Sequence, residues 1–307
     1  MNVVIKIRGG LGNQLFQYAF AKKIALEYNA QKIILDITYF NKTHIRKIDI
    51  DKYELPSNVY ISKKSENKVF DLLYFIYRIT DKINYKLKKT HRRSTKLLSK
   101  LGFFFCDNSY ELVTFNKNLN NIYLAGYFQN EMQIREICKN INTDFILKNN
   151  SLSDKYMQYK EKIIESEKSI GVSIRIGDDY KQFGWPICKK EFYENGVNLI
   201  NKKKGIENVF VFSDCIDLIE REQWFSKYNT VYIKECSAVE SLELLKNCTD
   251  FVIANSTFSW WGAYLSEENN KIIIAPEYFY KNVKTKDTTI AIKEMIYLNI
   301  ENGKIIE

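Results

Sequence analysis

The second half of the chain is constrained most by a regular alternation of short apolar runs with longer segments of helical periodicity. The predicted strands are 169–176, 208–214, 230–234, 250–256 and 271–276, and the predicted helices are 189–203, 217–228, 238–248 and 257–268. The runs are continuously apolar, which is typical of strands that are buried on both faces of a parallel sheet. The pattern therefore predicts a doubly wound α/β domain.

The first half begins in a similar way and then changes character. Strands are predicted at 2–8, 32–36 and 121–127, with helices at about 13–28 and 130–140, whereas residues 40–115 are more polar and basic. The chain has 307 residues, too many for one ordinary core. We expect two doubly wound domains facing each other across a cleft, residues 1–150 and 151–307, divided in the polar segment 146–156.

The positive charge is concentrated in one stretch. The net charge is +9, and residues 81–100 hold six Lys and two Arg against one Asp. The apolar, aromatic segment 69–79 precedes this stretch, so an insert at about 68–102 is either a surface for an anionic membrane or a solvated helix or loop face. No nucleic-acid motif accompanies the charge, and no apolar run approaches the ~20 residues that span a bilayer. We expect a cytoplasmic protein that makes peripheral contact with the inner membrane if the first alternative holds, and no nucleic-acid partner.

The cysteines and histidines do not form a metal-binding pattern. Six cysteines are scattered without a C-x-x-C pair, and the two histidines lie in different settings. We expect reduced, buried thiols and no metal site.

Polar residues follow the ends of the predicted strands, where ligands bind in open α/β sheets. Gly10, Gly12, Asn13 and Gln14 follow the first strand, but Leu15 stands where a dinucleotide fingerprint has its third glycine, and no Gly-Lys-Ser/Thr follows. The stretch is either an anion site at a helix start or a turn that only needs a positive φ.

Three further stretches lie at strand ends in the second half. Arg175 precedes Gly177, Asp178 and Asp179, which suits a pyrophosphate clamp with a nearby general base, or a simple Arg–Asp pair at a turn. Ser213 and Asp214 suit a helix cap or a contact with a nucleobase or ribose. The third stretch, Asn255, Ser256, Thr257, Phe258 and Ser259, offers helix amides and hydroxyls to a phosphate, and Trp260 and Trp261 after it form either a cleft wall or core.

Taken together, these stretches closely resemble the bacterial α-1,2-fucosyltransferases, glycosyltransferase family 11. The resemblance rests on GGLGNQLFQYAFA at 9–21, AGYFQ at 125–129, VFSD at 211–214 and NSTFSWWGAYL at 255–265. It implies a GT-B-type fold, GDP-β-L-fucose as donor without a required metal or other cofactor, and inversion to an α-fucoside. It also implies transfer to O2 of a galactose in a surface glycan such as an O-antigen repeat, built on a lipid carrier.

The resemblance also implies roles for single residues. Arg175 matches the first Arg of the family's His-x-Arg-Arg-Gly-Asp-Tyr motif, which grips the donor phosphates; Gly177 and Asp178 match its Gly and Asp. Donor contacts are implied for Gly10, Gly12, Asn13, Gln14, Ser213, Asp214, Asn255, Ser256, Thr257, Phe258 and Ser259. We expect Tyr127, Gln129 and Trp185 on the acceptor side.

The chain departs from the family motif at three positions. Ser173 replaces the His, so its hydroxyl would have to take over part of a guanine contact; Ile176 replaces the second Arg, and Asp179 is additional. Asp178 is our candidate for the catalytic base and Asp179 the alternative. The departures leave two other functions open: a transferase with another nucleotide sugar or linkage, and an inactive nucleotide-sugar-binding protein.

Overall fold

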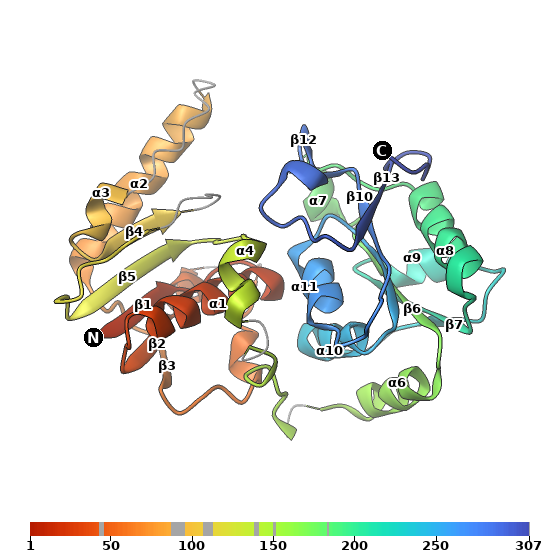
Figure 1. Ribbon diagram of the computed structural model, residues 1–307, viewed down its shortest axis with the longest axis horizontal. Coiled ribbons are helices and arrows are strands. Elements are labelled where there is room, and N and C mark those ends of the chain that lie inside the picture. Colours follow the sequence, from red (N-terminus) through yellow and green to blue (C-terminus); the bar gives the residue numbers. More distant parts are fainter. Residues whose placement is uncertain are drawn as a thin grey trace. The chain divides into compact units, whose positions relative to one another are not determined.

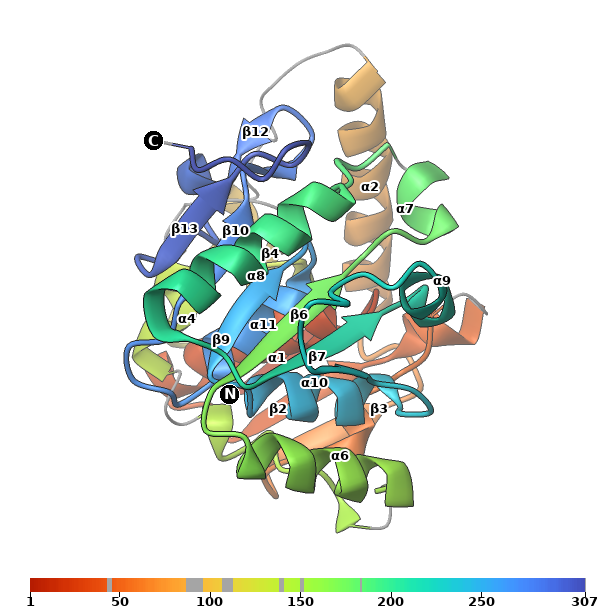
Figure 2. The ribbon, with the colours of Figure 1, turned by 90° about the vertical axis from the view of Figure 1, so that its right-hand side faces the viewer.

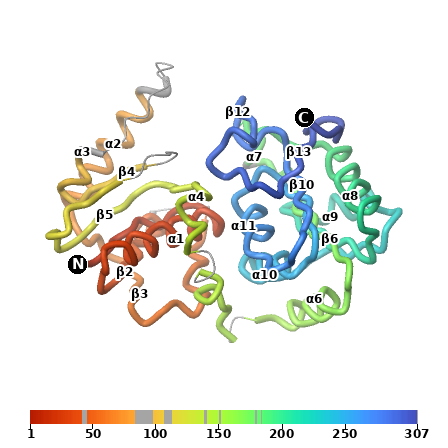
Figure 3. Tube along the Cα trace, in the orientation of Figure 1, coloured from red at the N-terminus to blue at the C-terminus, as the bar shows by residue number. Residues whose placement is uncertain are grey.

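The chain divides into two compact units, Met1–Ile146 and Leu147–Glu307. A computed structural model describes residues 1–42, 46–86, 96–106, 113–137, 141–149, 152–182 and 184–306 (Figure 3). The division lies at the start of the polar segment 146–156. Each unit contains its own parallel sheet, and each is described separately below.

The sheet of the first unit is five-stranded and parallel, in the order β3-β2-β1-β5-β4. Its strands are β1 (Asn2–Lys6), β2 (Lys32–Asp36), β3 (Val59–Ser62), β4 (Phe103–Cys106) and β5 (Asn121–Gly126). The sequence predicted β1, β2 and β5. The two edge strands lie within 40–115, where no strand was predicted.

Helices α1 (Leu11–Glu27) and α2 (Lys68–Lys86) cover opposite faces of this sheet. Successive side chains of a strand point to opposite faces. Accordingly Phe104 of β4 lies 6.2 Å from the Phe20 ring of α1, whereas Phe105 lies 5.8 Å from the Phe70 ring of α2. The shorter helices are α3 (Lys96–Ser99), α4 (Glu131–Ile134), η1 (Thr38–Lys42), η2 (Ile50–Lys52) and η3 (Arg135–Ile137). The predicted helix 130–140 is therefore short, and residues 138–140 lie outside the described part.

The sheet of the second unit is six-stranded and parallel, in the order β13-β10-β9-β6-β7-β8. Its strands are β6 (Ser169–Ile174), β7 (Asn208–Ser213), β8 (Thr230–Tyr232), β9 (Asp250–Ile253), β10 (Ile273–Pro276) and β13 (Met295–Leu298). Counted along the chain and read from β8, this is the 3-2-1-4-5-6 order of the doubly wound nucleotide-binding fold. The order reverses between β6 and β9, which therefore flank the place where such sheets bind ligands.

Helices cover both faces of the second sheet (Figures 1 and 2). Helix α8 (Lys190–Lys204) lies on one face, while α10 (Ala238–Lys246) and α11 (Thr257–Leu265) lie on the other. Gly262 permits the close approach of α11 to α10, because a Cβ there would lie 2.4 Å from a methyl carbon of Leu245. The remaining elements are α6 (Asp154–Glu165), α7 (Asp178–Gln182), α9 (Ile216–Arg221), β11 (Tyr278–Tyr280), β12 (Val283–Lys284) and η5 (Thr285–Asp287).

One buried carboxylate joins two helix starts in the second unit. Glu240 is only 3% exposed and accepts hydrogen bonds from the backbone amides of Ser153 and Ser237, both at 2.7 Å. Ser153 is the N-cap of α6 and Ser237 the N-cap of α10. Burial alone would raise the pKa of Glu240, but the hydrogen bonds from both serines outweigh it and lower the pKa. Glu240 thus stabilises this region in its charged form.

Candidate functional site

The ends of β6, β7 and β9 bring three predicted site residues to one edge of the second sheet. Ser173 pairs with Ile253 of β9, and Ile174 pairs with Ser213 of β7. Arg175 and Asp214 directly follow β6 and β7, and Asn255 lies two residues after the end of β9, so the three residues lie at neighbouring strand ends. This is the carboxyl edge at the reversal of strand order.

Arg175 is held between a carboxylate and an aromatic ring. Its Nη1 lies 3.1 Å from Oδ2 of Asp214, and its guanidinium carbon lies 5.1 Å from the centroid of the Tyr180 ring. The Tyr180 hydroxyl donates to the backbone carbonyl of Asn255 at 2.5 Å. The Arg175 side chain is 22% exposed. It is a fixed, solvent-reachable cation suited to an anionic ligand.

Asp214 uses its carboxylate to hold the turn after β6. Its Oδ1 accepts from the amide of Ile176 at 3.1 Å, and its Oδ2 accepts from the amide of Gly177 at 2.8 Å. Together with the ion pair to Arg175, these contacts occupy both oxygens. Asp214 therefore positions Arg175, a role that the sequence did not indicate.

The first turn of α11 presents backbone amides at the same edge. Ser256 is its N-cap and makes no side-chain capping hydrogen bond, and Ser256, Thr257 and Phe258 are half-buried. Helix starts of this kind attract anions because their first amides lack intrahelical acceptors. Trp260 and Trp261, further along, are fully buried, and the Trp260 indole donates to the carbonyl of Ile290 at 2.7 Å. The two tryptophans are core.

Asn255 is buried just before this helix, at 2% exposure. Its Nδ2 donates to the carbonyl of Pro186 at 2.7 Å, while its Oδ1 is buried without a hydrogen-bond partner among the described residues. An unsatisfied buried amide oxygen is uncommon in folded proteins and is a candidate acceptor for a ligand group.

Asp178 and Trp185 lie on the exposed side of this region. The carboxylate of Asp178, at the start of α7, is 85% exposed and pairs with Lys181 at 3.0 Å, an interaction that raises the pKa of Lys181. The Asp179 side chain lies outside the described part. Trp185 is 37% exposed, and its ring lies 6.4 Å from Tyr180 and 6.2 Å from Tyr280.

In the first unit, the strand order reverses between β1 and β5, and the glycine-rich turn follows β1. Gly9 has a φ of +82°, and a Cβ there would lie 2.8 Å from the Asn13 side-chain nitrogen, so the turn requires glycine. Asn13 accepts a hydrogen bond from Gln129 Nε2 at 2.8 Å. Asn13, which was predicted to contact the sugar donor, thus lies in contact with Gln129, which was predicted on the side of the glycan acceptor.

Gln14 is fully buried and its amide is fully used within the protein. Its Nε2 donates to the carbonyls of Gly9 at 3.1 Å and Lys47 at 2.9 Å. Its Oε1 accepts from the amides of Asp49 and Ile50, both at 3.0 Å. These contacts leave no hydrogen-bonding capacity for a ligand, so in this arrangement Gln14 anchors residues 47–50 to α1.

Arg8 is a candidate site residue that was not among those predicted from the sequence. It is 6% exposed, and its guanidinium carbon lies 4.1 Å from the Tyr127 ring centroid and 5.6 Å from that of Tyr74. Its backbone amide donates to Gln17 Oε1 at 2.9 Å. The sequence does contain an indication of Arg8, because an Ile-Arg pair stands at the end of the first strand in both units: Ile7-Arg8 and Ile174-Arg175.

The comparison with known families decides which proteins this chain is related to. Residues 2–299 match glycosyl transferase family 11. The chain belongs to this family.

Named members of family 11 resemble the chain over nearly its whole length. It is 28% identical to the Escherichia coli O-antigen biosynthesis glycosyltransferase WbnK, covering 92% of this chain and 96% of that protein. It is also 28% identical to an Escherichia coli alpha-1,2-colitosyltransferase, covering 91% of this chain and 92% of the relative. The predicted family is confirmed.

Solved fucosyltransferases share the fold at low sequence identity. Arabidopsis thaliana FUT1 aligns with a TM-score of 0.53 and 13% identity, over 93% of this chain and 72% of that one. The fucosyltransferase NodZ from Bradyrhizobium aligns with a TM-score of 0.50 and 14% identity, over 85% and 91% of the two chains. The fold of this family 11 member is thus of the GT-B type with two Rossmann-like domains, as predicted.

The departures from the family motif have structural counterparts. The Ser173 hydroxyl lies 2.7 Å from the Ser259 hydroxyl, and both side chains are buried, so this pair links β6 to α11. Ile176 packs against the core of the second unit. The Ser213 hydroxyl accepts from the amide of Cys215 at 3.0 Å, which forms a local turn. The hydroxyl groups of Ser173, Ser213 and Ser259 thus all have hydrogen-bond partners within the second unit.

Five free cysteines are described, and Cys106, Cys188 and Cys248 are buried. Burial raises the pKa of Cys188 to about 12. Within the described residues, no group of three or more His, Cys, Asp or Glu side chains could hold a metal ion.

Proposed function

We propose that this glycosyltransferase moves L-fucose from GDP-β-L-fucose to O2 of a galactose in a bacterial surface glycan, with inversion at the anomeric carbon. The observation that carries the proposal is Arg175, fixed by Asp214 and Tyr180 at the carboxyl end of β6. Support comes from the names of the relatives: one acts in O-antigen biosynthesis, and Arabidopsis FUT1 and NodZ have been crystallised with GDP. A cytoplasmic location and a lipid-linked acceptor belong to the same proposal.

The chemistry assigned to the site is a single displacement. The acceptor oxygen attacks C1 of the fucose, the bond from C1 to the diphosphate breaks, and GDP leaves with the bonding electrons. Arg175 and the first amides of α11 stabilise the charge that develops on the diphosphate. In this proposal these groups act without a metal, so activity in EDTA should equal activity in Mg²⁺.

The remaining predicted residues take supporting roles. Asp178, solvated and next to Gly177, is proposed to take the proton from the acceptor hydroxyl. The partly exposed Trp185 ring suits the apolar face of a sugar. In the first unit, Asn13, Gln129 and Tyr127 are the proposed contacts, whereas Gln14 keeps its structural role.

The donor has one specific alternative. A named relative is a colitosyltransferase, and colitose differs from fucose only by the absence of the 3-hydroxyl. Thermal unfolding with GDP-fucose, GDP-colitose, GDP-mannose and UDP-galactose separates the donors, since a ligand that binds the native state raises the unfolding temperature. A larger shift with GDP-colitose would replace fucose in the proposal.

The activity is tested with GDP-fucose and a set of galactosides, by measuring GDP release and the linkage of the product. Arg175→Ala should lower kcat/KM more than about 100-fold, because a charge-assisted contact to a phosphate contributes a few kcal/mol. Arg221→Ala, which removes an exposed Arg from α9, is the matched control and should be unaffected. Unchanged kinetics in Arg175→Ala would refute the assignment, and GDP-fucose binding without product would favour a non-catalytic binding protein.

A further inference from the structure

Helix α2 is attached to the first unit along one face only. Phe70, Leu73, Tyr74 and Tyr77 pack with Phe105 of β4 in a small apolar cluster. None of the helices in the described part is long and apolar enough to cross a membrane, α2 included. In Figure 1, α2 extends away from the sheet of its own unit.

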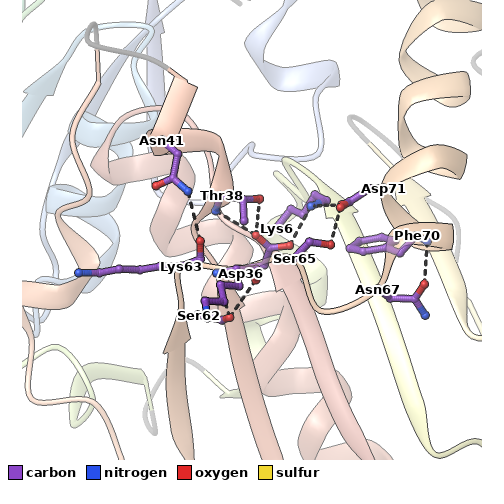
Figure 4. A network of polar contacts seen from close by, with 11 residues as sticks. Lys6, Asp36, Thr38, Asn41, Ser62, Lys63, Ser65, Asn67, Phe70 and Asp71 are labelled. Atoms are coloured by element: carbon purple, nitrogen blue, oxygen red, sulfur yellow. Dashed lines mark hydrogen bonds and ion pairs between the residues drawn. The ribbon is translucent and has the colours of Figure 1, made fainter.

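Polar contacts fix the N-terminal end of α2 (Figure 4). Lys6 Nζ lies 2.8 Å from Asp36 Oδ2 of β2 and 2.6 Å from Asp71 Oδ1 of α2. Asn67 Oδ1 accepts from the amides of Val69 and Phe70, at 2.8 and 3.1 Å. These contacts hold the start of the helix on the sheet and so set the direction of its outer face.

The outer face of α2 is apolar and exposed, and we call it the α2 stripe. Its members and their exposed fractions are Val69 56%, Leu72 58%, Phe75 61%, Ile76 48%, Ile79 42% and Ile83 50%. At 100° per residue these six fall within an arc of about 120°. A contiguous row of large exposed apolar side chains is unusual for a free surface and indicates a binding surface.

The charge beside the stripe indicates what it binds. Lys82 is exposed and lies about 20° beyond the edge of the arc. The sequence 81–100, which continues from the helix, holds six Lys and two Arg against one Asp. An apolar helix face that is followed in the sequence by many Lys and Arg residues is typical of a segment that binds anionic lipid headgroups over an acyl region.

A second copy of the chain fits the charge less well. Five members of the stripe, Val69, Leu72, Ile76, Ile79 and Ile83, are spaced alternately three and four residues apart, as in a coiled coil. Pairing two such helices in parallel would bring two strongly basic segments together, and like charges oppose association.

We propose that the α2 stripe inserts into the interfacial region of a membrane containing anionic phospholipid, with Lys82 at the headgroups. The helix would lie in the plane of the surface, with the side of α2 that carries Phe70, Leu73 and Tyr77 toward the protein. Membrane binding by the α2 stripe does not depend on which donor or acceptor the enzyme uses.

The test is cosedimentation of the full chain with vesicles of phosphatidylcholine alone or of phosphatidylcholine with phosphatidylglycerol at 3:1. The wild type should bind the anionic vesicles at least about tenfold more tightly than the neutral ones, and 0.5 M NaCl should reduce that difference. Ile76→Gln with Ile79→Gln should lower binding at least about tenfold, because two apolar side chains no longer insert. Met157→Gln with Ile164→Gln, at exposed positions of α6, is the matched control and should bind within twofold of the wild type.

The proposal is overturned if the wild type binds neither vesicle, or if Ile76→Gln with Ile79→Gln binds like the control. It is also overturned if the chain sediments without lipid as a dimer that this double variant dissociates, since the stripe then contacts a second copy. Unfolding temperatures of both double variants should match the wild type, because all four side chains are exposed, at 42% to 66%. Donor binding in the thermal shift assay is independent of the vesicle result, so the two proposals fail separately.

Discussion

Replacing Asp214 by Asn is the most informative perturbation of the site. Asn retains one acceptor oxygen, but its amide nitrogen would face a backbone N–H, so one of the bonds from Ile176 and Gly177 is lost. A hydrogen bond to a charged group contributes about 1.5–3 kcal/mol. The ion pair with Arg175 adds up to about 1 kcal/mol, the upper end for a pair that still reaches solvent, because its two side chains are only 22% and 17% exposed.

Together, these contributions predict that Asp214→Asn removes about 2–3 kcal/mol of stabilisation from the turn that carries Arg175. We expect kcat/KM for GDP release to fall about 30–150-fold, because the guanidinium is no longer fixed toward the diphosphate. The unfolding temperature of the protein should fall by roughly 4–10 °C, and the kinetics should be measured well below it.

The matched control is Asp217→Asn, which removes an 87% exposed carboxylate paired with Lys234 and should change neither quantity. A kcat/KM within threefold of the wild type would refute the positioning role of Asp214. A loss of stability without a loss of activity would reduce Asp214 to a turn-stabilising residue.

Three further predictions concern other parts of the chain. The pKa of Glu240 in the folded protein lies below its ordinary value of 4.5. The stabilisation by its carboxylate is therefore present above that value and is lost as the pH falls through the folded pKa. Between pH 7 and pH 3, the unfolding temperature of the wild type should consequently fall more steeply than that of Glu240→Gln. Gly126→Ala should destabilise the first unit by more than about 3 kcal/mol in urea unfolding, because its Cβ would lie 1.8 Å from the Cys106 carbonyl oxygen, and an unchanged midpoint would contradict that geometry. Asp178→Asn should reduce transfer more than about 100-fold while GDP affinity stays within twofold, and near-normal turnover would remove Asp178 as the base.

The sequence predicts the central strands of both sheets well, because these strands are buried on both faces. The predicted bounds of β2 agree with the structure, and β6 (Ser169–Ile174) is buried along its whole length. The edge strand β3 was missed because its apolar run, Val59 to Ile61, is only three residues long and lies in a polar and basic region. β4 was missed because it is only four residues long and follows the basic segment.

The site shows a similar division between what the sequence predicts and what it does not. Topology places Arg175 and Asn255 at adjacent strand ends, so their proximity follows from the predicted fold. The partner of a polar side chain is a tertiary property. Asp214 holds amides that lie 37 and 38 residues away in the chain, and Gln14 holds a carbonyl 33 residues away. No local pattern distinguishes such residues from ligand contacts.

The anchoring of residues 47–50 by Gln14 has a consequence for the diversification of this enzyme. Four hydrogen bonds of one side chain tie α1 to the glycine turn and to the backbone of residues 47–50. A substitution at Gln14 would therefore release two separate segments of the first unit at once. Neighbouring segments can be exchanged between relatives only where these four bonds are kept, which makes position 14 a fixed point for any grafting in the first unit.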